Sequence, residues 1–165
     1  MRARLRREDG FGMLEMLISL TILNVGILAV IAAFNSGAVS LQRASEISSA
    51  AALADKQMEL YRAIKYTAIS LDTSSVTATS ATYKADAAYT AGTQLTAVCS
   101  PITNQCNPSR TTTGPDGRSY RVDTFIIAQT PTGGRALKLV TVVVRRSSGL
   151  AALARVASTF DASTG

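Results

Sequence analysis

The chain of 165 residues is long enough for one compact domain and an accessory element, but too short for two full domains. It contains no His and only two Cys, so this chain alone cannot supply a tetrahedral zinc site or a Ser-His or Cys-His catalytic pair. Of the basic residues behind its net charge of +6, four Arg lie in the first ten positions and the rest are spread thinly, so we expect no specific nucleic-acid partner.

The N-terminal part is a basic segment followed by a long apolar run. In residues 11–34, Glu15 is the only charged residue. About 20 apolar residues in a helix cover the ~30 Å hydrocarbon core of a bilayer, so this run is long enough to span a membrane. Because basic residues precede the run, the positive-inside tendency places Met1 in the cytoplasm and the C-terminal bulk of the chain outside.

The helical pattern continues beyond the apolar run. No Pro occurs before Pro101, and small or apolar residues recur at steps of three or four from Leu41 onward, which indicates one helical face. We therefore expect one helix from Phe11 to Tyr66, roughly 84 Å long at the standard helical rise. The predicted buried face consists of Ala44, Ile47, Ala51, Ala54, Met58, Tyr61 and Ile64. The predicted solvent face consists of Arg43, Glu46, Asp55, Lys56, Glu59, Arg62 and Lys65.

Residues 67–98 lose the helical period and are dominated by Ala, Thr and Ser, which predicts a long irregular connection with at most a short helix or strand. Cys99 and Cys106 then enclose six residues. In an oxidising compartment this spacing predicts a small disulfide-closed loop, whereas in the cytosol the pair would be free thiols. The predicted topology favours the disulfide, which would staple a small domain.

Strand signals dominate the C-terminal part. After a turn signal at residues 114–117, alternating side chains at residues 120–126 predict a half-buried strand. Residues 131–134 turn the chain back, and residues 137–144, apolar on both faces, predict a more central strand. Residues 150–160 form either a final strand or a helix. The predicted fold class is α+β, with a long N-terminal helix whose second half packs on a small antiparallel sheet.

No constellation in residues 67–165 indicates an enzyme. The acidic residues are dispersed, and without His or a carboxylate pair at a useful spacing they are most simply surface or turn residues. We therefore expect no cofactor, no metal and no small-molecule substrate. The dispersed residues are Asp72, Asp86, Asp116, Asp123 and Asp161.

The junction of the basic segment and the apolar run carries the most informative motif. Residues 6–17 read RREDGFGMLEML: a short charged leader ends in Gly10, Phe11 follows, and the fifth residue of the hydrophobic helix is Glu15. This junction resembles the class III signal of type IV prepilins and type II secretion pseudopilins. The resemblance implies that a membrane-embedded prepilin peptidase cuts between Gly10 and Phe11 and methylates the new amine of Phe11.

The same resemblance implies a structural role and a division of the chain. The subunit would be held in the inner membrane, with its C-terminal domain outside, and then join an extracellular or periplasmic filament through contacts with other pilin subunits. The late pair of strands looks most like that of the PilV-type minor pilins and their pseudopilin relatives. The implied parts are a leader (1–10), a transmembrane and assembly half of the helix (11–34), an amphipathic half (35–66) and a headgroup (67–165).

Glu15 has a physical interpretation of its own. A carboxylate within an apolar helix costs about 2.5–3.5 kcal/mol on insertion scales, and such residues normally face a partner. Removal of the leader creates one, the positive amine of Phe11, and a wrong register between subunits would leave both charges unpaired. The resemblance implies that Glu15 pairs with this amine on a neighbouring subunit. The alternative is that Glu15 lies near the cytoplasmic interface and reaches water.

Two other classes of protein share parts of this pattern. A secreted protein with a conventional signal peptide would be cut after residues 38–40, although its apolar segment usually spans only about 7–15 residues and lacks an acid such as Glu15. A single-pass membrane protein that never assembles would keep Met1 and bind a ligand outside the cell. The first residue of the mature chain separates these classes, because the prepilin class predicts Phe11 and the secreted class predicts Leu41.

Overall fold

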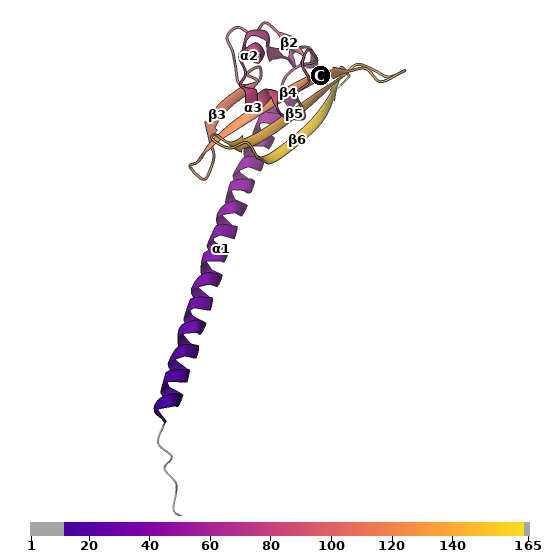
Figure 1. The fold of residues 1–165 in the computed structure, drawn as a ribbon. Helices are drawn as coiled ribbons and strands as arrows, with labels where there is room; N and C mark the ends of the chain where they lie inside the picture. The colour runs from indigo at the N-terminus through magenta and orange to yellow at the C-terminus, as the bar shows by residue number, and fades with distance from the viewer. Residues whose placement is uncertain (1–11, 164–165) are drawn as a thin grey trace, which may run out of the picture. The chain divides into compact units, whose positions relative to one another are not determined.

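The computed structural model describes residues 12–163, and the chain divides into two compact units between Arg43 and Ala44. Helix α1, Met13–Arg62, is the long helix expected from the sequence (Figure 1). It ends before the expected Tyr66, and a short 3-10 turn, η1, follows at Tyr66–Ala68. This earlier end turns the chain so that Ile69 and Leu71 enter the core. Phe11, the expected first residue of the helix, lies outside the described residues.

The second unit is built on an antiparallel sheet of four strands in the order β3-β4-β5-β6 (Figure 1). The α+β fold class is confirmed, and the two predicted strands are present as β4 and β5. The expectation that residues 120–126 form a half-buried strand is wrong, because residues 122–126 are buried on both faces. The segment left open between strand and helix forms β6. The strands are β3 (Ser109–Thr113), β4 (Ser119–Gln129), β5 (Leu137–Arg146) and β6 (Ala152–Asp161).

Strand β3 was not expected, because its sequence Ser-Arg-Thr-Thr-Thr has no apolar residue. It pairs with β4 through the predicted turn at residues 114–117. Gly117 there has a φ of +75°, a backbone region that favours glycine. A Cβ on Gly114 would lie 2.6 Å from the Tyr120 ring. The two glycines therefore allow both the tight turn and the close packing of Tyr120.

The connection between helix and sheet contains more local structure than expected. Asp72 caps helix α2, its carboxylate accepting a hydrogen bond from the Ser75 N–H at 2.8 Å. Ser80 caps α3 in the same way through the Tyr83 N–H at 3.3 Å. Strands β1 and β2 form a short parallel pair. The elements are β1 (Leu71–Asp72), α2 (Thr73–Thr77), α3 (Ala81–Lys84) and β2 (Thr96–Ala97).

One face of the four-stranded sheet packs on the C-terminal part of α1. Apolar side chains of the helix meet the even-numbered positions of β4 and β5, and together they form the larger core. Burial of such side chains contributes about 1.5–3 kcal/mol each, which fixes this part of the helix on the sheet. The core includes Leu53, Met58 and Tyr61 of α1, Val122 and Ile126 of β4, and Val140, Val142 and Val144 of β5.

The buried face of α1 is rotated relative to the prediction. Glu46, expected on the solvent face, is 1% exposed, whereas Ile47, expected in the core, is 43% exposed. The Glu46 carboxylate forms ion pairs with Arg118 in the β3–β4 turn and with Arg146 at the end of β5. These two guanidinium groups supply the charge that a buried carboxylate requires. The prediction was wrong because both partners are distant in sequence.

The other face of the sheet is covered by α3 and the residues that follow it. The Tyr83 ring stacks on Phe125 of β4 with 4.4 Å between ring centroids, and Tyr89 meets Tyr83 edge-on at 5.7 Å. The Tyr83 hydroxyl donates a hydrogen bond to the Thr124 carbonyl at 2.6 Å. Val143 of β5 belongs to this second cluster. The two central strands, β4 and β5, are thus buried on both faces, which explains why residues 137–144 lack polar alternation.

A network of five charged residues lies on this second face. Arg121 and Arg145 stand opposite each other on β4 and β5, where like charges would repel. The Oδ2 atom of Asp123 accepts hydrogen bonds from both, at 3.2 Å from Arg121 Nε and 2.6 Å from Arg145 Nη1. Asp86 pairs with Arg145 and, at 2.9 Å, with Arg155. The expectation that Asp86 and Asp123 are surface or turn residues is therefore wrong.

Replacing Asp123 by Ala would leave Arg145 buried without its central partner. We expect Asp123→Ala to lower the free energy of unfolding by about 3–5 kcal/mol, the typical cost of breaking a buried ion pair on one side. Urea unfolding of the full-length protein in detergent, followed by circular dichroism, measures this loss. Asp55→Ala, at an exposed position of α1, is the matched control. Equal effects of the two substitutions would contradict a structural role for the network.

Candidate functional site

Beyond Glu15, the first part of α1 has an apolar surface without charge. No charged residue occurs between Glu15 and Arg43. By length and composition, the helix contains a stretch able to cross a membrane, and none of that stretch is buried in the structure. A surface of this kind is stable only in lipid or against other apolar surfaces. Its large exposed side chains are Met13, Leu14, Met16, Leu17, Ile18, Leu20, Ile22, Leu23, Val25, Ile27, Leu28, Val30, Ile31, Phe34, Val39 and Leu41.

Several polar side chains within this stretch bond to the helix itself. The Thr21 hydroxyl donates to the Ile18 carbonyl at 2.7 Å. The Asn24 amide donates to the Leu20 carbonyl at 3.1 Å, and the Ser40 hydroxyl to a carbonyl one turn earlier at 3.0 Å. Such bonds satisfy these donors where no water is present. These three residues therefore do not prevent the helix from lying in an apolar environment.

Glu15 is exposed in the first turn of α1. Its backbone N–H donates to the Gly12 carbonyl at 2.9 Å, and its carboxylate lies at the positive end of the helix dipole. Gly10 and Phe11, the predicted cleavage and methylation residues, lie outside the described residues. The roles of all three residues remain predictions.

Two shallow hollows lie along one side of this apolar stretch. The first, about 520 Å³, surrounds Gly26, and the second, about 450 Å³, surrounds Gly37. A Cβ on either glycine would meet no atom within 4 Å, so open space lies over both. Small residues of this kind let a second helix approach closely. Residues spaced by three or four positions line the two hollows in succession, and Val30 lines both. These residues are Ile22, Gly26, Val30, Ala33, Gly37 and Leu41.

In the second unit, a disulfide joins Cys99 to Cys106 and closes a short loop. Two side chains of α1 hold the backbone of this loop. Gln57 Nε2 donates to the Asn104 carbonyl at 2.8 Å, and the Tyr61 hydroxyl donates to the Gln105 carbonyl at 2.5 Å. Burial raises the pKa of Tyr61 to about 12, so its hydroxyl keeps its proton at neutral pH. The loop is thus tied to the same helix that carries the apolar stretch.

Asp72 holds the loop from the other side. Its backbone N–H donates to the Cys106 carbonyl at 2.7 Å, and its carboxylate accepts a hydrogen bond from the Cys99 N–H at 3.2 Å. The Ser74 hydroxyl at 2.5 Å, followed by the N–H and hydroxyl groups of Ser75, holds the pKa of Asp72 well below its usual range. Asp72 therefore acts as an ionised anchor for both the loop and α2.

Sequence reasoning did not connect Gln57, Tyr61 or Asp72 with the disulfide loop. The contacts join residues 47, 44 and 27 positions apart, respectively. No local pattern marks such long-range partners. One signal could have indicated a buried contact. Gln57 is a polar residue on the part of the helix face between Leu53 and Tyr61 that is otherwise apolar.

The charged residues of the second unit offer little for catalysis. Among residues 12–163, no group of three or more His, Cys, Asp or Glu side chains could hold a metal ion. Burial alone would raise the pKa of Asp86, but the Ala88 N–H and then Arg155 and Arg145 hold it below its usual value. Asp86 is thus an ionised partner of arginines, and a poor general base at neutral pH.

The comparisons with known proteins identify the N-terminal segment. Residues 5–31 match the family model described as the prokaryotic N-terminal methylation motif. The match contains Gly10, Phe11 and Glu15 and ends within the apolar stretch of α1. No curated protein and no solved structure matches the chain significantly.

Loss of the Asp72 charge should weaken the second unit in acid. Because the pKa of Asp72 is lower in the folded chain than its ordinary value of 3.8, its stabilising effect is complete above that value and disappears as the pH falls below it. We expect Asp72→Asn to lower the melting temperature at pH 7 and to flatten its decline between pH 5 and pH 2. Thermal unfolding across this pH range measures both effects, with Asp55→Asn as the control. If the melting temperature of the wild-type protein fell with pH in parallel with that of the Asp72→Asn variant, the stabilising role of the Asp72 charge would be contradicted.

Proposed function

Because the chain carries the N-terminal methylation signal of the type IV pilin family, we propose that it is a structural subunit of a type IV pilus-like filament, most like a minor pilin. The observation that carries this proposal is the continuity of the motif with α1, whose apolar side chains are exposed along the whole stretch that follows. The methylation motif is thus continuous with the exposed apolar stretch of α1, which needs lipid or another apolar surface as a partner.

Maturation would occur at the membrane. Prepilin peptidase would cleave between Gly10 and Phe11, remove the basic leader and methylate the amine of Phe11. Before assembly the subunit would lie in the inner membrane with residues 67–165 outside, consistent with the basic residues that precede the apolar run. Cleavage would leave Phe11 as a positively charged end close in sequence to Glu15.

Assembly would bury the apolar stretch of α1 against the same stretch of other subunits. Apolar area removed from water contributes about 25 cal/mol per Å², so helices leaving lipid for a water-exposed fibre gain most by packing together. The hollows at Gly26 and Gly37 would admit side chains of a neighbouring helix. Glu15 would pair with the Phe11 amine of a neighbour and so set the register between subunits.

The second unit would serve as the headgroup and carry out no chemistry of its own. We propose no cofactor and no small-molecule substrate. A pseudopilin of a type II secretion or DNA-uptake system would use the same N-terminal motif, so the filament type depends on the partner subunits. The partners proposed for this chain are the prepilin peptidase and other pilin subunits.

The mature N-terminus tests the proposed processing. We expect mass spectrometry of the native, membrane-derived protein to show a chain that begins at Phe11, with its amine methylated. A chain that begins at Leu41 would indicate a conventional signal peptide, and a chain that still begins at Met1 would indicate a permanent anchor. Either of these results would overturn the proposal.

Substitution of Glu15 tests the proposed assembly contact. We expect Glu15→Ala to leave cleavage after Gly10 intact but to reduce incorporation into sheared filaments at least about tenfold, the ratio that corresponds to 1.4 kcal/mol. Quantitative immunoblots of the filament and membrane fractions measure the ratio. Asp55→Ala, an exposed change on the same helix, should incorporate normally. Undiminished incorporation of Glu15→Ala would exclude the role of Glu15 in assembly.

A further inference from the structure

Strand β6 leaves a long backbone edge open. It pairs with β5 on one side and forms the end of the sheet. Within residues 12–163, no element pairs with the other side of its ten residues. The edge at the opposite end of the sheet, β3, has five residues. Unpaired N–H and C=O groups along such an edge are a template for a strand of another chain.

The two faces of β6 differ in chemistry. Positions that face α1 include Val156 and Phe160, which pack on the core but are only partly buried. The other face carries two charges of opposite sign, Arg155 in the first half of the strand and Asp161 at its C-terminal end. The Arg155 side chain is 42% exposed while paired with Asp86, and the Asp161 side chain is 26% exposed at 3.9 Å from Arg135. An added strand would therefore meet an apolar face and a charged face.

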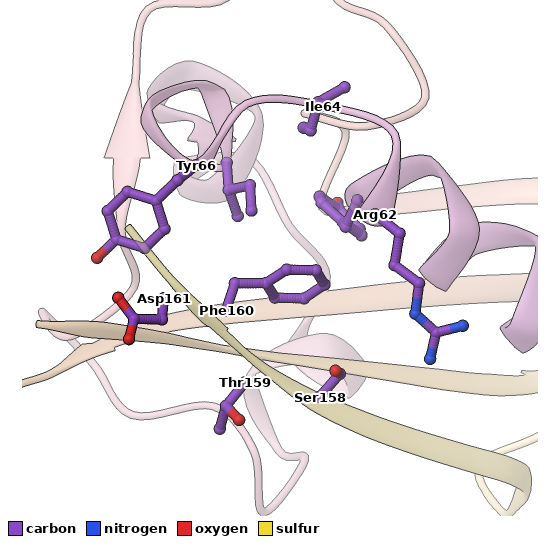
Figure 2. A pocket seen from close by; sticks show the side chains of 9 residues that line it. Arg62, Ile64, Tyr66, Ser158, Thr159, Phe160 and Asp161 are labelled. Carbon is purple, nitrogen blue, oxygen red and sulfur yellow. The ribbon is translucent and has the colours of Figure 1, made fainter. Parts of the chain in front are cut away.

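A half-open pocket of about 280 Å³ lies beside the C-terminal end of β6. Figure 2 shows the Phe160 side chain reaching into it, with Arg62 to one side and Tyr66 and Asp161 to the other. Its lining includes four consecutive residues of the strand, 158–161, together with the buried Tyr61 and Ile69. A strand added to β6 would run along this pocket and place an apolar side chain next to it.

We propose that β6 is a self-association edge, on which a second copy of this chain adds its own β6 in antiparallel orientation about a two-fold axis at Ser158. In this register Arg155 lies opposite Asp161 of the second copy, and the pair occurs twice. Val156 then lies opposite Phe160 of the second copy, on the face that packs on α1.

The sequence of the strand selects this occupant and this register. Residues directly opposite in an antiparallel pair lie on the same face, so opposite charges there attract. A shift of the axis by one residue places Arg155 opposite Thr159 or Ser163 and loses both charge pairs. The half-buried Val156 and Phe160 would each cover the other, next to the pocket. A two-fold contact uses the same surface on both copies, which a self-complementary strand supplies.

This inference does not depend on the N-terminal motif, because it rests on the second unit alone. The test therefore uses the full-length chain, purified in detergent, and a readout separate from filament assembly. Cys99 and Cys106 are joined to each other, so one introduced cysteine is the single reactive thiol among the described residues.

Ser158→Cys tests the two-fold axis. Residues opposite each other in an antiparallel pair have Cα atoms about 4.5–5.5 Å apart, within the range that a disulfide bridges. We expect mild oxidation to convert Ser158→Cys into a covalent dimer on a non-reducing gel. The matched control is Thr111→Cys on the exposed part of β3, which should remain monomeric. Dimer yields that are equal for the two variants would overturn the proposal, because the detergent alone would then explain the contact.

A charge reversal tests the register. In the Ser158→Cys background, Asp161→Arg places like charges opposite each other, and we expect dimer formation to fall at least about tenfold. Circular dichroism of the variant should show an intact fold, because Asp161 is the last residue of β6. An undiminished dimer would overturn the register. A crosslink of Ser158→Cys to a different protein in membranes, without the homodimer, would overturn the choice of a second copy as the occupant.

Discussion

The two parts of helix α1 have different environments, and the rest of the structure depends on this difference. Over its first part α1 exposes apolar side chains and carries no charge between Glu15 and Arg43, so its stability there requires lipid or another apolar surface. Over its last part the same helix packs on a sheet and buries Leu53, Met58 and Tyr61. One continuous element thus joins a stretch without internal partners to a folded core. In the proposed function, membrane insertion and assembly both use the first of these parts.

Apolar burial stabilises the second unit, and buried charges determine how its elements are arranged. Glu46 and Asp123, the two least exposed carboxylates among residues 12–163, each pair with two arginines. Buried ion pairs contribute little net stability relative to apolar packing, but they penalise any arrangement that separates the partners. Glu46 fixes the rotation of α1 on the sheet, and Asp123 fixes the pairing of β4 with β5. The arrangement therefore favours one packing of the second unit over its alternatives.

The sequence predicted those features that depend on local patterns. The long helix, the antiparallel strands β4 and β5 and the proximity of Cys99 to Cys106 follow from periodicity and spacing. Strand β3 was not predicted because it has no apolar residue. The rotation of the buried face of α1 was not predicted because Arg118 and Arg146, the partners of Glu46, lie far from it in the chain. The cover formed by Tyr83 over the sheet was missed for the same reason. Of the candidate site, the sequence located the motif and the apolar stretch, whereas the anchors of the disulfide loop required the three-dimensional structure.

The back-bonded side chains of Thr21, Asn24 and Ser40 have a consequence for transfer between phases. Each donates to a carbonyl of its own helix, so no bond to solvent or to a neighbour has to be made or broken when the surroundings change. A helix built in this way can pass from lipid to a protein bundle with these three donors already bonded. In the proposed filament, these three donors would need no new partner during either assembly or disassembly.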